Sequence, residues 1–358
     1  MVSNNIRVIN DIQKLSIDDY QCLVRQYIDY VKEKPFVKSI YQIGSVNDPG
    51  ISDVDLVVVV DNCCNPHAIN QLSINQSQGN NALKYIIFHD IYLYDRESFK
   101  NFHYSLYCDN LELLYGEPQP VNKIEASQID IISLQIIFDF ISSRLVQFQQ
   151  FLASGQLSLR GILVRVSSIK HSYMLLNNLG IEDEEIRKFV ERAMDIRKKY
   201  TSVNEQTIIK LFLESFYYFS RIVSLAANYF SEKFLNFHSV LEASNSLKIN
   251  PQFILRFVNQ APDVYRSVKN ESTIYYPEEV FYHYLAYTEY SNVISQKARY
   301  YLSYCGDESY DLDQAYKDVL KERLSAISSH LKFLKENRAY YAMRGFPGFV
   351  VNWNDIAP

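Results

Sequence analysis

The spacing of apolar residues divides the chain into a mixed first third and a helical remainder. Apolar positions at helical spacing follow Ser16, the expected N-cap, and predict a helix that ends near Glu33. Short apolar runs then predict strands over 37–43, 53–60 and 83–94, and a further apolar piece covers 111–116. Residues 61–82 are rich in Asn, Gln and Ser and predict a loop with one weak helix; a short helical segment is expected near 97–107.

Helix-breaking residues almost disappear beyond residue 120. No proline occurs between 121 and 250, and no glycine between 181 and 305. Because glycine and proline interrupt helices, their absence beside 3.6-residue periodicity predicts helices over 127–153, 158–179, 182–200, 204–232, 278–303 and 312–340. The tail over 344–353 is expected to be irregular.

These patterns predict an α+β protein with two domains. Pro118 and Pro120 mark a boundary between them. We expect a mixed β-sheet with helices over residues 1–120 and a mostly α-helical domain over 121–358. A chain of 358 residues, 47% of them hydrophobic, is long enough to bury two cores.

Composition and charge exclude several functional classes. The net charge is −5, and residues 1–120 hold nine Lys and Arg against fifteen Asp and Glu, so a long nucleic acid is not an expected partner. No apolar run approaches the roughly 20 residues of a membrane helix, and the N-terminus lacks a signal-peptide core. The five cysteines have no metal-binding spacing. We expect free thiols and a cytoplasmic protein without a membrane partner.

Two aspartates open the second predicted strand. Asp53 and Asp55 are two residues apart, so on an extended backbone they project from one face. The apolar run Leu56–Val60 follows them and suits a strand buried on both faces. Two carboxylates at the start of a buried strand are unfavourable unless a cation neutralises them. The pair is therefore a candidate metal site.

Other chemistries that use an Asp-x-Asp motif fit this context poorly. An EF-hand loop starting at Asp53 needs glycine at its sixth position, where this chain has Val58. Sugar-nucleotide transferases and phosphatases with an aspartyl nucleophile place the motif after an apolar strand, whereas here the acids precede it. The order of acids and apolar residues thus favours a different metal site.

The preceding strand ends in Gly44 and Ser45, which suit a phosphate ligand. Glycine lets the backbone approach a ligand closely, and Ser45 offers an amide and a hydroxyl to phosphate oxygens. Asp53 and Asp55 would hold Mg²⁺, with Mn²⁺ as the alternative, because these hard cations take oxygen ligands and bridge to phosphates. Asp90 is expected within the third strand, where it would be the third carboxylate and could accept a proton from an attacking hydroxyl.

Taken together, these residues resemble the nucleotidyltransferase superfamily that includes the DNA polymerase β palm, aminoglycoside nucleotidyltransferases, poly(A) polymerases and bacterial cyclic-dinucleotide synthases. The family pattern is an apolar strand, Gly followed by Gly or Ser, a spacer, two acids alternating with apolar residues, and a later acid. It is matched by 43–45, 52–56 and 89–91, within a resemblance that covers about 17–116. The resemblance implies Mg²⁺ and nucleoside triphosphate binding, transfer of a nucleoside monophosphate to a hydroxyl, and release of pyrophosphate.

Three features leave alternatives open. The spacer between Ser45 and Asp53 is seven residues, shorter than in many members. His89 stands where the family has an aliphatic residue beside its third acid, so Asp95 remains a rival to Asp90. Lys170 lies at the edge of an apolar helical stripe and is the candidate cation for the triphosphate; the favoured alternative is a solvated lysine that buries only its stem. His89, His103 and His171 have no metal-ligand spacing and are expected to be structural.

Three functions are consistent with these residues. The first is a nucleotidyltransferase that modifies a hydroxyl of a small molecule, a nucleotide or a protein. The second is a non-catalytic module with the nucleotidyltransferase fold, which loss of the third carboxylate would favour. The third is a toxin-like modifier of protein or RNA hydroxyls, which the sequence does not separate from the first.

Overall fold

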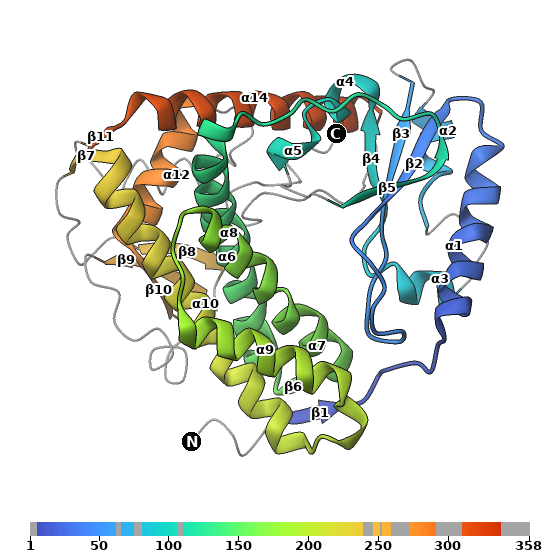
Figure 1. Ribbon diagram of the computed structural model, residues 1–358, viewed down its shortest axis with the longest axis horizontal. Coiled ribbons are helices and arrows are strands. Elements are labelled where there is room, and N and C mark those ends of the chain that lie inside the picture. Colours follow the sequence, from blue (N-terminus) through green and yellow to red (C-terminus); the bar gives the residue numbers. More distant parts are fainter. Residues whose placement is uncertain are drawn as a thin grey trace. The chain divides into compact units, whose positions relative to one another are not determined.

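The computed structural model describes residues 6–61, 66–74, 81–105, 110–238, 246–250, 253–258, 273–290 and 310–337 (Figure 1). They form an α+β protein with two compact units. The sheet unit contains Ile12–Ile124, and the helical unit contains Glu125–Glu322. Two segments depart from a single boundary: residues 6–11 belong to the helical unit, and the last part of the final helix, from Arg323, belongs to the sheet unit. None of the described helices has the length and apolar character needed to cross a membrane.

The sheet unit is built on four strands in the order β4-β3-β2-β5. Strand β3 is antiparallel to β2 and parallel to β4, and β2 is antiparallel to β5. The bounds are β2 Val37–Ile43, β3 Asp55–Val60, β4 Tyr92–Asp95 and β5 Leu111–Gly116. The helices of this unit are α1 Ile17–Lys32, α2 Pro66–Asn70, α3 Asn81–Ile86, α4 Arg96–Phe99 and α5 Phe102–Ser105.

Helix α1 begins where the sequence predicts. The Ser16 side chain accepts a hydrogen bond from the Asp19 amide, and the Asp19 carboxylate accepts one from the Ser16 amide, which completes a capping box. The buried side of α1 packs on the sheet, and Figure 1 shows the helix alongside β2 and β3.

Two apolar cores cover the two faces of this sheet. Leu56, Val58 and Val60 face the core that includes α1 and α3. Val57 and Val59 face the opposite core, together with aromatic residues of β2, β4, α4 and α5. Because side chains alternate along a strand, Asp55 lies on the same face as Val57. The core that contains Val57 and Val59 therefore lies on the same face of the sheet as Asp55, at the start of β3.

The strand predicted over 83–94 is wrong in its first half. Residues 81–86 form helix α3, and the strand is confined to Tyr92–Asp95. Leu83, Ile86 and Ile87 follow helical spacing and are buried in the core under α1. A short apolar run has no distinctive periodicity, so the sequence pattern does not separate a strand from a buried helix here.

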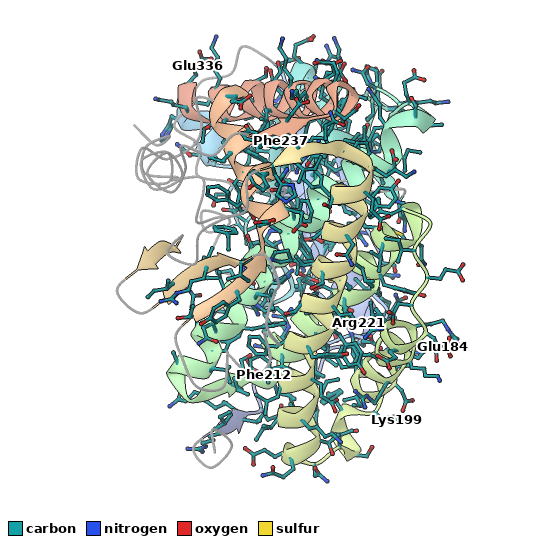
Figure 2. All side chains as sticks on the ribbon, turned by 90° about the vertical axis from the view of Figure 1, so that its left-hand side faces the viewer. Glu184, Lys199, Phe212, Arg221, Phe237 and Glu336 are labelled. Atoms are coloured by element: carbon teal, nitrogen blue, oxygen red, sulfur yellow. The ribbon has the colours of Figure 1, made fainter. Side chains whose placement is uncertain are left out.

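The helical unit follows the predicted helices closely, with one division. The segment predicted as one helix over 158–179 is two, because residue 168 ends the first and begins the second. The helices are α6 Ile129–Ser154, α7 Leu159–Ser167, α8 Ile169–Asn178, α9 Glu184–Lys198, α10 Glu205–Phe234, α12 Glu278–Tyr290 and α14 Gln314–Glu336, with short 3₁₀ turns η2 Ala126–Gln128 and η3 Tyr200–Ser202. Figure 2 labels Arg221 on α10, which forms ion pairs with Asp183 and Glu185 at the start of α9.

Small sheets in the helical unit were not predicted. Strand β1 Arg7–Ile9 pairs with β6 Gln156–Ser158, and β7 Leu235–His238 pairs with β11 Tyr310–Leu312. A third sheet has the order β10-β9-β8, from β8 Ser246–Asn250, β9 Phe253–Val258 and β10 Thr273–Pro277.

Of the five cysteines, Cys22 is described and has a free, exposed thiol. The other four, the predicted tail over 344–353 and the predicted helical residues 291–303 lie outside the described residues.

Candidate functional site

The pairing of β2 with β3 brings the two sequence motifs together. Ile43, the last residue of β2, pairs with Asp55, the first residue of β3. Gly44 and Ser45 therefore leave the sheet beside the aspartates. The antiparallel register makes the end of one strand and the start of the other a single edge of the sheet.

The loop that carries Asp53 is fixed by buried hydrogen bonds. The Tyr20 hydroxyl donates to the Ser52 carbonyl oxygen at 2.7 Å and accepts from the Gly50 amide at 3.1 Å. The Val54 amide donates to the Ile86 carbonyl oxygen at 2.8 Å. Since Tyr20 belongs to α1 and Ile86 to α3, two helices hold the backbone on both sides of Asp53.

Asp53, Asp55 and His89 form a cluster of donor atoms at this edge. One carboxylate oxygen of each aspartate and one ring nitrogen of His89 lie within 4.8 Å of one another. The closest contact joins His89 Nε2 and Asp55 Oδ1 at 2.6 Å. The Asp55 and His89 side chains are 13% and 29% exposed, so the site is accessible to a ligand while partly shielded from water.

The His89 ring is held on both nitrogens. Its Nδ1 lies 2.6 Å from the Asp90 carbonyl oxygen, which can only accept, so Nδ1 carries a hydrogen. The hydroxyl of Tyr92, the first residue of β4, lies 2.8 Å from Nε2. The two rings are also in contact, with centroids 4.7 Å apart. These contacts fix the direction in which Nε2 points.

The structure does not bring Asp90 into the cluster. Its carboxylate accepts hydrogen bonds from the Ile74 amide at 3.0 Å and the Ile91 amide at 2.8 Å, and a short one from the Ser73 hydroxyl. Asp90 precedes β4 and is not inside a strand, so strand alternation does not set its direction. The expectation of Asp90 as third carboxylate is therefore not supported by this geometry, and His89 occupies that position.

Asp95, the alternative to Asp90 as the third carboxylate, does not lie in the cluster either. It is the last residue of β4 and pairs with Val60, at the opposite end of β3 from Asp55. Its carboxylate caps helix α4 by accepting from the Ser98 amide at 3.0 Å. Asp95 has a structural role at a helix N-terminus.

Gly44 and Ser45 differ in what they can offer a ligand. Gly44 has a φ of +71°, and a Cβ built on it would meet no atom within 4 Å, so the space above its backbone is open. Its amide donates to the Asn110 carbonyl oxygen at 3.2 Å. The exposed Ser45 hydroxyl accepts from the Asn47 side-chain amide at 3.0 Å, which leaves its hydrogen able to donate to a phosphate oxygen.

Lys170 lies on α8 in the helical unit and is half-buried. Its role toward a triphosphate stays a prediction. His171, the next residue, is exposed.

His89 is the site residue to which the sequence pattern assigns no function. Its position three residues before the start of β4, the strand parallel to β3, is the signal that could have identified it, because the starts of parallel neighbours lie at one edge.

The donor set suits a divalent cation. Carboxylate oxygens are ligands for Mg²⁺ and Mn²⁺, and a neutral imidazole nitrogen adds a ligand that Mn²⁺ and later transition metals accept. Comparisons with protein-family models, curated protein sequences and solved structures find no match to this chain.

Proposed function

We propose that the chain is a metal-dependent nucleotidyltransferase that transfers a nucleoside monophosphate from a nucleoside triphosphate to a hydroxyl, with release of pyrophosphate. The observation that carries the proposal is the Ile43–Asp55 pairing, which puts Gly44 and Ser45 beside Asp53 and Asp55. A phosphate-binding element and a metal-binding pair at one sheet edge are the two parts that this chemistry needs.

Each residue has a distinct part in this proposal. Gly44 admits the triphosphate close to the backbone, and Ser45 donates its hydroxyl hydrogen to a phosphate oxygen. Asp53 and Asp55 hold Mg²⁺ or Mn²⁺, which when bound neutralises phosphate charge and orients the α-phosphate. The acceptor oxygen forms a bond to the α-phosphorus as the bond to pyrophosphate breaks, and the acceptor proton passes to Asp53 or to solvent.

A non-catalytic nucleotide-binding module is the second candidate. Among the described residues, the cluster contains two carboxylates and a histidine, without a third carboxylate to accept the acceptor's proton. The Asp90 carboxylate, the expected third acid, accepts hydrogen bonds from the loop at Ser73 and Ile74. This observation favours binding without transfer.

The two candidates separate in one experiment. The protein is incubated with each α-labelled nucleoside triphosphate, with Mg²⁺ or Mn²⁺ and with panels of hydroxyl acceptors, and transferred label and pyrophosphate are measured. The proposal predicts transfer that the Asp53→Asn/Asp55→Asn variant lacks. Metal-dependent binding of nucleotide without transfer to any acceptor supports the binding module, and failure to bind nucleotide contradicts both.

A further inference from the structure

The arrangement around His89 leaves a negative oxygen directly opposite a ring nitrogen. Nδ1 donates its hydrogen to the Asp90 carbonyl oxygen at 2.6 Å, and a neutral imidazole carries one ring hydrogen. In the neutral ring, Nε2 then presents a lone pair toward Asp55 Oδ1, at 2.6 Å. Two lone pairs at that distance repel each other unless they share a proton or both bind one cation.

We infer that His89, through Nε2, is the third protein ligand of the cation held by Asp53 and Asp55, and that this donor set favours Mn²⁺ over Mg²⁺. This inference rests on the proposed function, whose metal site it completes. Three donor atoms within 4.8 Å of one another come from the loop before β3, the first residue of β3 and the segment before β4.

The hydrogen bond at Nδ1 is the arrangement that a metal-binding histidine needs. Histidine ligands usually donate their second ring nitrogen to a carbonyl or carboxylate, which fixes the tautomer and the ring direction. The Asp90 carbonyl oxygen supplies that acceptor here. The Tyr92 ring adds a second restraint, because it packs against the imidazole, whereas the Tyr92 hydroxyl, 2.8 Å from Nε2, would give up that contact when a cation takes the lone pair.

The Asp90 carboxylate supports this arrangement indirectly. This carboxylate accepts hydrogen bonds from the Ile74 and Ile91 amides and so fixes the backbone that carries the Asp90 carbonyl group. Asp90 thus acts through its main chain as a positioning residue for His89. The predicted acid has a role at the site, but its carboxylate is not in the cluster.

The choice of cation follows from the nitrogen ligand. Mg²⁺ strongly prefers oxygen donors and retains its water shell, whereas Mn²⁺ accepts carboxylates and imidazole together. Replacing His89 by aspartate would convert the cluster to oxygen donors alone. That change is expected to lower the ratio of Mn²⁺ to Mg²⁺ affinity, because Mg²⁺ gains an oxygen donor and Mn²⁺ loses its nitrogen donor.

The decisive test is pulsed electron paramagnetic resonance of Mn²⁺ added to the full-length protein. The inference predicts the coupling of a directly bound ¹⁴N nucleus, which changes to the ¹⁵N pattern when the protein is made with ¹⁵N-labelled histidine. This readout needs no variant and no knowledge of the acceptor. The coupling should be lost in His89→Ala and His89→Gln and retained in His171→Ala, a change at an exposed histidine of the helical unit.

Three results would overturn the inference in different ways. Tight Mn²⁺ binding without a coupled histidine nitrogen would make His89 a structural partner of Asp55 and leave the proposed metal site intact. No Mn²⁺ binding by the folded protein would remove the metal site itself, and the proposed function with it. An unchanged ratio of Mn²⁺ to Mg²⁺ affinity in a folded His89→Asp variant would also contradict the proposed selectivity.

Discussion

His89 Nε2 lies 2.6 Å from Asp55 Oδ1. The His89 ring, which is expected from the sequence to be structural, therefore contacts a carboxylate of the candidate metal site. The same ring is anchored through Nδ1 to the Asp90 carbonyl oxygen. This relationship changes the composition of the site from three carboxylates to two carboxylates and an imidazole. It also separates what Asp90 does from what Asp53 and Asp55 do.

Asp90 is predicted to matter for stability more than for metal binding. Its carboxylate accepts two amide bonds and one hydroxyl bond, so Asp90→Ala should lower the free energy of unfolding by about 1–3 kcal/mol. Asp90→Asn keeps an oxygen for the amides and should cost less. Chemical denaturation measures both values. A large loss of Mn²⁺ affinity in a folded Asp90→Asn variant would show that the carboxylate itself is a ligand.

Gly44 is predicted to be needed for nucleotide binding. Gly44→Ala forces a side chain onto a backbone with φ +71° and should destabilise the protein by about 1–2 kcal/mol. Gly180→Ala is the matched control, because Gly180 has φ +75° and equally open space but lies after α8. Nucleotide affinity, measured calorimetrically, should fall in the first variant alone. Equal affinities in the two variants would remove Gly44 from the site.

A buried polar cluster in the helical unit is predicted to contribute strongly to stability. Asp139 accepts from the Tyr287 hydroxyl and contacts His283 Nε2 at 3.2 Å, while the Tyr316 hydroxyl lies 2.7 Å from His283 Nδ1. Asp139 and His283 are fully buried and join α6 to α12 and α14. Asp139→Ala should cost about 3–5 kcal/mol because it leaves polar partners buried.

Thermal and urea unfolding test this expectation, with Asp195→Ala as the control. Asp195 pairs with Lys199 on the exposed surface of α9, where an ion pair contributes less than about 1 kcal/mol. Similar losses in the two variants would contradict a specific role for the buried cluster.

The free energy of unfolding is predicted to decrease as the pH is lowered, because of His330. Burial lowers the pKa of this histidine from 6.5 to about 4, and its Nε2–H donates to the Leu93 carbonyl oxygen at 2.6 Å on β4. The folded state therefore binds a proton less tightly than the unfolded state. The contribution is complete above about pH 6.5 and declines as the pH falls toward about 4, by up to about 3 kcal/mol.

The His330→Gln variant isolates this effect, since glutamine can donate to Leu93 but does not titrate. The free energy of unfolding, measured by urea titration across that pH range, should fall less steeply in the variant than in the wild type. Parallel pH dependences would show that other groups carry the acid sensitivity.

Elements with local signals were predictable from the sequence. The Ser16 cap and the apolar spacing define α1, and the Gly44 end of β2 and the acidic start of β3 follow from residue type and order. The long helices α6, α9 and α10 follow from sustained periodicity without helix breakers. These features depend on neighbours in the sequence.

Features decided by tertiary contacts were not predictable. The pattern after Leu83 predicts a strand, because the burial of Ile86 and Ile87 in the core shared with α1 is set by tertiary packing and not by the local sequence. The pairing of Phe253–Val258 with a parallel neighbour, Thr273–Pro277, depends on contacts that no short pattern reports. The exchange of Asp90 for His89 arises because residues before β4 are not extended, so alternation does not determine which side chain reaches Asp55.

The sharpest test of the proposed site is equilibrium binding of Mn²⁺ or Mg²⁺, and of nucleoside triphosphates with the cation and after chelation, to the wild type and to Asp53→Asn/Asp55→Asn. The wild type should bind nucleotide only with the cation, and the variant should lose metal affinity by at least the roughly 10–100-fold that an outer-shell change alone costs. The variant should remain folded, because the substitution removes repulsion between adjacent carboxylates. Nucleotide binding that is absent in the wild type, or is equal in both proteins with and without the cation, would contradict the assignment of this site.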